Sequence, residues 1–251
     1  MSGHSKWSTI KHKKGAKDAK RAKIFTRLVK ELTVAVKEGG GTDPEFNPRL
    51  RLAIANAKGA NMPKENIERT IKKADKDGSN LQEYTFEGTG HGGAAIFVEC
   101  LSDNNQRTVS EVRHVFSKYG GELGKNGSLS YIFERKGVFV IPEGDFDPEE
   151  LELELIDAGL EEMEKNEEGK YVLTVDMKDF GNMQKKLEEM KITAENAELQ
   201  RIPKMYKTLD PETAMKALNI VEKLEELDDV QTVYHDIELT DEVAKAIEEQ
   251  G

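Results

Sequence analysis

The sequence predicts an α+β protein of three domains: an N-terminal three-helix bundle, an α+β domain, and a ferredoxin-like βαββαβ domain inserted in the second. The 251 residues exceed what one small core needs. Apolar residues recur at helical spacing up to about residue 76, and strand-like runs follow. The charge also changes sign: residues 1–76 carry 19 basic and 8 acidic residues, whereas the remainder carries 18 and 40. This asymmetry indicates a polyanion-binding module joined to a body of opposite charge.

The first domain is expected over residues 1–78. Residues 1–15 show no hydrophobic period and are interpreted as an extended arm. A helix is predicted from Ala16 to Glu38, where apolar residues recur every three or four positions. Gly39-Gly40-Gly41 ends this helix, and Asn47-Pro48 begins a second one, because proline is tolerated in a first turn. A third helix follows Pro63 and runs to about Lys76.

The second domain is expected in two pieces, residues 79–133 and 204–251. Its first strands are joined by the glycine-rich stretch GTGHGG. The pattern Thr108-Val-Ser-Glu111 is typical of a capping box before a helix. The predicted elements, in order, are strands 84–87 and 94–101, a helix after Thr108, strands 128–133 and 204–209, a helix after Asp210-Pro211, a strand 230–239 and a short helix capped by Thr240.

Residues 134–203 predict the inserted domain. The expected order is strand 137–141, helix 148–158, strand 160–165, strand 170–177, helix 180–190 and strand 194–202. Leu151, Leu153 and Leu155 alternate with glutamate as in a strand. Asp147-Pro148 ahead and Gly159 behind favour a helix there instead. Sequence order alone also permits three domains in a row.

Composition excludes several classes of protein. No apolar run approaches the roughly 20 residues that a membrane helix needs. The basic N-terminus lacks the apolar core of a secretory signal. The single cysteine, Cys100, excludes an internal disulfide and a multi-cysteine zinc site, and it fits a reducing compartment. We therefore expect a cytoplasmic protein, monomeric and not bound to a membrane.

Enzyme signatures are absent from the sequence. GTGHGG formally matches the dinucleotide pattern GxGxxG, but a β-branched run follows where that site requires a helix, so a hairpin turn is favoured. No P-loop pattern occurs. The histidines lack metal-site spacing, and the carboxylates lie in runs such as Glu149-Glu150 that are typical of solvated faces. We expect no enzymatic activity, no cofactor, no metal and no small-molecule substrate.

The basic N-terminus is the strongest functional signal. Residues 1–30 hold ten basic residues and one acid, Asp18. Lysines spaced along an arm and one helix face suit a phosphate backbone, where each neutralised phosphate releases counterions. Trp7 is the only tryptophan of the sequence. Two interpretations are open: its ring stacks on an unpaired base, or it packs against the apolar surface of the bundle and anchors the arm there. The stretch from Glu143 to Glu168, with 13 acids and Lys165, is interpreted as a solvated face that does not contact phosphates. The alternatives are that it mimics nucleic acid, contacts basic proteins or masks the basic arm.

Five stretches in order closely resemble the YebC family: GHSKW, IKHKKGAKDAKRAKIFTRL, ANMPKENIERTIKKA, YTFEGTGHGGAAIFVECLSDN and YGGELGKNGSLSYIFERKG. A mitochondrial relative is the translational activator of cytochrome oxidase subunit I. The resemblance implies the three-domain fold given above and a cytoplasmic, non-enzymatic protein. The matched N-terminal motif includes His4, Lys6, Trp7, Lys11, Lys13, Lys14, Lys17, Lys20, Arg21, Lys23 and Arg27. With Lys30, Lys64 and Arg69, these are the predicted nucleic-acid-binding residues, a role inferred from their chemistry.

Two functions fit these residues. The family is described as probable transcriptional regulators that bind DNA, and the third helix offers Asn61, Lys64, Asn66 and Arg69 for reading bases. The alternative is a ribosome-associated translation factor that binds RNA and relieves stalling, for example at proline-rich sequences. A Lys-rich arm with one aromatic residue suits insertion among RNA strands.

Overall fold

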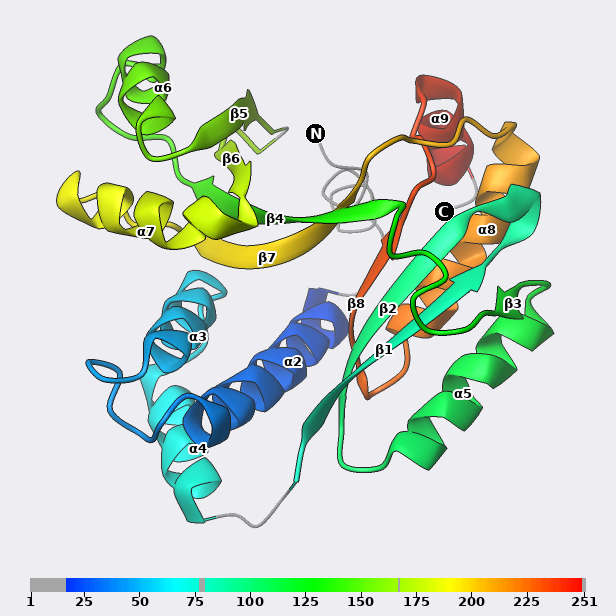
Figure 1. Cartoon of the computed structure of the whole chain (residues 1–251), viewed down its shortest axis with the longest axis horizontal. Helices are drawn as coiled ribbons and strands as arrows, with labels where there is room; N and C mark the ends of the chain where they lie inside the picture. Colours follow the sequence, from blue (N-terminus) through cyan, green and yellow to red (C-terminus); the bar gives the residue numbers. More distant parts are fainter. Residues whose placement is uncertain (1–16, 77–79, 167, 250–251) are drawn as a thin grey trace. The chain divides into compact units, whose positions relative to one another are not determined.

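The computed structural model describes residues 17–76, 80–166 and 168–249 (Figure 1). These residues form two units, each discontinuous in sequence. Unit 1 combines residues 17–76 with 135–200, and unit 2 combines residues 80–134 with 201–249. The predicted α+β class is confirmed, since helices and two four-stranded sheets are both present. The predicted boundaries at residues 78, 133 and 203 stay predictions.

Unit 1 begins with the three-helix bundle: α2 (Lys17–Glu38), α3 (Pro48–Gly59) and α4 (Lys64–Lys76). The second helix begins where predicted, because the Asn47 side chain accepts a hydrogen bond from the Leu50 N–H at 2.9 Å. The Asn47 amide also donates to the carbonyl oxygens of Ala35, at 2.7 Å, and Gly41, at 2.8 Å. One buried side chain thus ties the end of α2 to the start of α3. The core contains Leu32, Ala35, Val36, Leu50, Ala53, Ala57, Met62, Ile67 and Ala74.

The second part of unit 1 has the predicted βαββαβ order. Its elements are β4 (Phe133–Ile141), α6 (Pro148–Ile156), β5 (Leu160–Lys165), β6 (Tyr171–Asp176), α7 (Phe180–Glu189) and β7 (Asn196–Pro203). The sheet order β5-β6-β4-β7 is that of a ferredoxin-like domain. The Leu/Glu segment around Leu153 is helical, as predicted: Leu151 and Leu155 are buried, and Leu153 is exposed.

The bundle docks on this sheet through Asn56 of α3. Its amide donates to the Ala197 carbonyl oxygen and accepts from the Ala197 N–H, both at 2.9 Å. Gly59 permits the close approach, since a Cβ at this position would lie 1.8 Å from the Glu195 carbonyl oxygen. The bundle and the βαββαβ domain therefore share one unit.

Unit 2 is built on the sheet β3-β1-β2-β8. Its elements are β1 (Gln82–Thr89), the 3-10 turn η1 (His91–Gly93), β2 (Ala95–Ser102), α5 (Asn105–Lys118), β3 (Glu122–Leu123), α8 (Pro211–Glu225), β8 (Val230–His235) and α9 (Asp241–Glu249). Side chains of α5, α8 and α9 join one face of the sheet in a core that includes Ile96, Phe116 and Leu218. Phe97, Leu129 and Tyr234 form a second cluster.

Three sequence-based expectations for unit 2 are wrong. The cap of α5 is Asn104, whose side chain accepts from the Arg107 N–H at 3.1 Å; Thr108 lies inside the helix. Residues 128–132 form turns held by Glu87, and the next strand begins at Phe133. In place of a strand over 204–209 there is a single bridge between Lys207 and Ile237. The short strand β3 was not expected. Within the described ranges, no helix is long and apolar enough to cross a membrane.

Candidate nucleic-acid interface

The basic residues of α2 differ in exposure. Arg21 is exposed, whereas Lys23, Arg27 and Lys30 are half-buried. Half-burial is compatible with a role in phosphate binding, because long basic side chains bury their stems while the charged head stays in water. The predicted residues His4, Lys6, Trp7, Lys11, Lys13 and Lys14 lie outside the described part of the chain, as do the side chains of Lys17 and Lys20.

Arg21 links the start of α2 to the turn between α3 and α4. Its guanidinium lies 5.2 Å from the centre of the Phe25 ring and donates to the Asn61 carbonyl oxygen at 3.4 Å. Asn61 has a φ of +57°, which turns the chain toward Lys64, the first residue of α4. The structure therefore brings the first turns of α2 and α4 to one end of the bundle, which sequence separation did not indicate.

The two predicted residues of α4 are both exposed. The Lys64 side chain is 84% exposed and its ammonium lies 3.7 Å from the Glu68 carboxylate. An ion pair this exposed contributes little to stability, so the ammonium can exchange Glu68 for another anion. Arg69 donates to the Asn66 side-chain oxygen at 3.0 Å. Asn66 and Arg69 thus form a preorganised pair on the helix that was predicted to read bases.

Two acids of the bundle pair with α3, whereas Glu65 and Glu68 lie at the start of α4 with Lys64. Arg49 of α3 binds Glu31 at 3.2 Å and Glu38 at 2.6 Å, and both acids lie in the second half of α2. The helix α3 itself contains Arg49, Arg51 and Lys58 and no acidic residue. Basic charge therefore dominates the start of α2 and the length of α3, while two of the acids are neutralised internally.

A hollow of about 530 Å³ lies beside α3 within unit 1. Arg51, Ile54 and Lys58 line one side, and residues 193–195, which precede β7, line the other. The sequence does not indicate this hollow, because it forms between segments far apart in the chain. Arg51 and Lys58 place basic groups on its α3 side, and Glu45 and Glu195 also line it.

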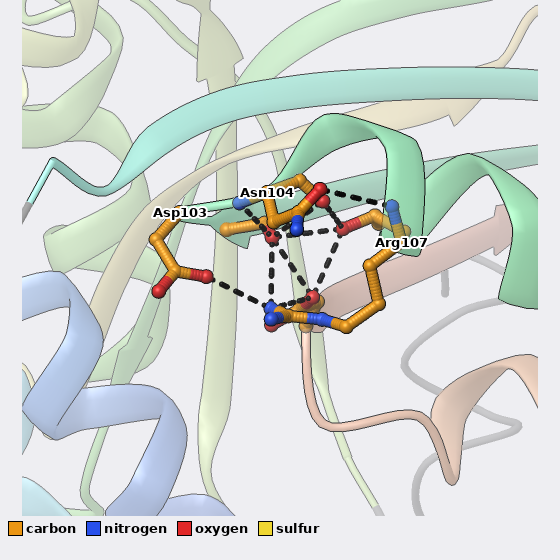
Figure 2. A network of polar contacts seen from close by, with 6 residues as sticks. Asp103, Asn104 and Arg107 are labelled. Atoms are coloured by element: carbon orange, nitrogen blue, oxygen red, sulfur yellow. Dashed lines mark hydrogen bonds and ion pairs between the residues drawn. The ribbon is translucent and has the colours of Figure 1, made fainter.

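A second polar site, in unit 2, contains the buried carboxylate of Asp229. Figure 2 shows this network of polar contacts, with Asp103, Asn104 and Arg107 labelled. The Asp229 carboxylate accepts hydrogen bonds from the Ser102 hydroxyl (2.8 Å), the Arg107 guanidinium (2.8 Å) and the Thr108 hydroxyl (2.9 Å). Arg107 also pairs with Asp103 at 2.9 Å. The hydrogen bonds that Arg107 donates to Asp229 and Asp103 raise its pKa above its already high ordinary value, so the guanidinium is permanently charged. This network fixes the turn between β2 and α5.

The motifs that suggested other chemistries are structural. In GTGHGG, Gly92 has a φ of +66°, and the strand β2 follows, so no helix terminus faces the turn. His91 Nε2 donates to the Tyr119 carbonyl oxygen at 2.9 Å. Cys100 is buried in β2. Among the described residues, no group of three or more histidine, cysteine or acidic side chains is placed to hold a metal ion.

Comparison with known proteins connects both units to characterised sequence families. Residues 5–77 match the model of the TACO1/YebC protein N-terminal domain, and residues 81–237 match the TACO1/YebC second and third domain. These descriptions agree with the three-domain architecture described above.

Two relatives share the same name. A probable transcriptional regulatory protein of Chlorobaculum parvum is 48% identical over 252 residues, covering all of both chains. One from Amoebophilus asiaticus is 52% identical and covers 94% of this chain and 98% of its own. The crystal structure of a conserved hypothetical protein from Aquifex aeolicus has a TM-score of 0.79 at 42% identity, covering 88% of this chain and 91% of that one.

Proposed function

Because the chain belongs to the TACO1/YebC family, we propose that it is a non-enzymatic regulator of gene expression that binds DNA through its Lys-rich N-terminal arm and α2. The observation that carries the proposal is the charge division: residues 1–76 have a net charge of +11 within a chain of −11. The names of the relatives support a role in transcription.

The geometry of the bundle supports a continuous phosphate contact. Arg21 and Lys64 share one end of the bundle, and the basic residues 6–14 shortly precede α2 in the sequence. Such residues position a protein on a duplex but do not read its sequence. The Asn66–Arg69 pair on α4 supplies side chains of the kind that bind adenine and guanine edges. We therefore assign phosphate binding to the arm and α2, and base contacts to α4.

The acidic body complements this assignment. The segment from Glu143 to Glu168 repels a polyanion, so binding is restricted to the basic end of the chain. The same charge division also suits RNA, and a ribosome-associated role is the alternative. The two functions differ in target and in the salt concentration at which each target is retained, which makes them separable by experiment.

The test uses full-length protein in which Lys11, Lys13, Lys14 and Lys17 are replaced by glutamine. Its matched control replaces the same number of exposed lysines in unit 2: Lys118, Lys125, Lys216 and Lys245. Duplex DNA is titrated by fluorescence anisotropy at several salt concentrations, and ribosome co-sedimentation is measured in the same buffers. Since each phosphate contact contributes roughly 0.9 to the logarithmic salt slope, the arm variant should lower the slope by about 3 to 4.

The control should bind DNA like the unmodified protein. An arm variant that retains the full salt slope would refute the assignment of the arm. Co-sedimentation with ribosomes at salt that releases the protein from DNA would favour the translation role. For base reading by α4, Arg69→Ala should reduce preference for a selected duplex by about 1–3 kcal/mol while leaving non-specific binding nearly unchanged.

A further inference from the structure

One edge of the unit 2 sheet is only partly covered. The strand β3 pairs with β1 at Gly88 and Thr89, and the Gly124 N–H donates to the Glu87 carbonyl oxygen at 2.7 Å. Within the described ranges, no strand pairs with this side of Gln82–Phe86, although the other side pairs with β2 along the whole strand. Sheet edges of this kind can accept an added strand.

The backbone of Thr85 faces this open edge. Carbonyl and N–H groups of alternate residues in a strand point to the same side. The Glu87 carbonyl oxygen points toward Gly124, away from β2. The N–H and C=O of Thr85, two residues earlier, therefore point away from β2 as well. They are placed to exchange a pair of hydrogen bonds with an extended peptide backbone.

A groove runs along this edge. A cavity of about 400 Å³ is bounded by residues 83–86 of β1 and by Asn105, Val109 and Arg113, which are spaced four apart on one face of α5. Leu123 and Gly124 line its end, where β3 lies between β1 and α5 (Figure 1). The strand β3 is therefore an extended segment of the protein itself that lies at the end of this groove.

The charge in the groove indicates the kind of peptide. Arg113 is exposed, and no acidic residue in the described part of the chain pairs with it. Arg107 on the same helix, by contrast, binds both Asp103 and Asp229. Glu83 lines the β1 side of the groove and would repel an acidic side chain placed there. An acidic side chain of a bound peptide therefore fits only when it faces α5. Val109, which is half-buried, offers apolar surface for a neighbouring side chain.

We propose that the groove between β1 and α5 binds an extended, acidic and apolar peptide segment of a partner protein by strand addition. Backbone hydrogen bonds to Thr85 supply affinity, and Arg113 selects acidic side chains. This site belongs to unit 2 and is independent of nucleic-acid binding by the basic arm. It gives the protein a second, protein-directed interaction.

The probe is a set of terminally blocked nonapeptides in which apolar and acidic residues alternate, with a matched set carrying lysine in place of each acid. Amide hydrogen exchange of full-length protein is followed by NMR. Acidic peptides should slow exchange of the Thr85 N–H at least 10-fold and bind at least 10-fold more tightly than the lysine set. Equal binding of the two sets, or no protection of the Thr85 N–H, would overturn the proposal.

Two variants locate the site. Thr85→Pro removes the outward N–H and is tolerated on a strand edge, whereas Thr85→Val keeps it. Arg113→Glu reverses the selecting charge, and Lys118→Glu reverses an exposed charge on the same helix outside the groove. Thr85→Pro and Arg113→Glu should each weaken acidic-peptide binding at least 10-fold, and their controls less than 2-fold, with circular dichroism unchanged.

Other occupants would give different results. Displacement of the peptides by single-stranded oligonucleotide at equal concentration would identify the groove as a nucleic-acid site instead. Concentration-dependent dimerisation that Thr85→Pro abolishes would show that a second copy fills the edge. If Thr85→Pro unfolds the protein, Arg113→Glu together with Thr85 protection decides the question, since neither requires the proline variant.

Discussion

In the helical bundle, the buried polar side chain among the described residues is a neutral amide, Asn47, whereas unit 2 buries three carboxylates. Glu87, Asp229 and Asp236 each accept hydrogen bonds from backbone or side-chain donors that hold a turn or a strand end. The bundle, in contrast, keeps its charges at or near the surface. The difference separates two uses of charge: neutralised charge fixes local structure in unit 2, and surface charge is available to a ligand in the bundle.

The largest effect is expected from removing the Asp229 carboxylate. Asp229→Ala leaves the Ser102 and Thr108 hydroxyls without their shared acceptor and removes one of the two acids bound to Arg107. We expect a loss of about 2–4 kcal/mol in the free energy of unfolding, measured in urea. Asp103→Ala, which removes the exposed partner of Arg107, should cost less than about 1 kcal/mol. Equal losses would contradict the contrast between buried and surface charge.

A smaller loss is expected in the bundle from Asn47→Ala. This change removes three hydrogen bonds, to Leu50, Ala35 and Gly41, and should destabilise the protein by about 1–3 kcal/mol. The matched control is Asn104→Ala, since Asn104 caps α5 from an exposed position and should cost about 1 kcal/mol or less. A larger loss for Asn104 would show that burial does not determine the strength of these caps.

Glu87→Gln tests whether charge or shape holds the turn after β3. The carboxylate accepts from the backbone N–H groups of Gly127, at 2.8 Å, and Leu129, at 2.5 Å. An amide offers one acceptor and turns a donor toward the second N–H, so we expect a loss of about 1–2 kcal/mol. Hydrogen exchange at Gly127 and Leu129 should accelerate more than at other amides. Unchanged exchange would mean that the turn holds without the charge.

The smallest effect is a pH dependence at Asp236. Burial raises the pKa of this carboxyl, although the Ala95 N–H and Lys207 oppose the shift. A raised folded-state pKa means that stability is greatest below the ordinary aspartate pKa and is lost as pH rises through the folded pKa. The Tm of the unmodified protein should therefore fall relative to that of Asp236→Asn as the pH rises above about 4.

Asp210 gives the opposite sign and serves as the control for Asp236. Hydrogen bonds from Thr213 at the start of α8 lower the pKa of Asp210. Its contribution is therefore present above the ordinary aspartate pKa and lost as pH falls through the folded value. Relative to Asp210→Asn, the unmodified protein should lose Tm as pH is lowered from about 5 to 3. The same direction for both variants would refute the assigned shifts.

Elements with strong local signals were predictable from sequence. Gly39-Gly40-Gly41, Asn47-Pro48 and Asp147-Pro148 mark helix ends that the structure confirms. The expectation that Thr108 caps a helix is wrong, because its hydroxyl donates a hydrogen bond to Asp229, which lies 121 positions later in the chain. The local capping-box pattern contains no information about that partner. Asn104, a common capping residue, was the signal that could have located the true start of α5.

The candidate interface was predictable in composition but not in arrangement. The basic residues are evident in the sequence, yet the contact of Arg21 with the Asn61 carbonyl depends on how the helices pack. Glu87 resembles a solvated glutamate in sequence, although it is buried. The groove beside Thr85 exists because β3 is only two residues long. An alternation of apolar and polar residues cannot be recognised in so short a strand.

The pairing of β2 with β8 sets the order in which the protein can be made. Val98 of β2 lies opposite Val233 of β8, and the whole βαββαβ segment is synthesised between them. During synthesis from the N-terminus to the C-terminus, the first half of unit 2 is made early. Its sheet cannot be completed until β8 has been made. Unit 1 has all its residues by Gln200 and can fold while that sheet still has an open edge at β2. A chain interrupted before β8 would therefore contain a complete basic module and an incomplete unit 2 sheet.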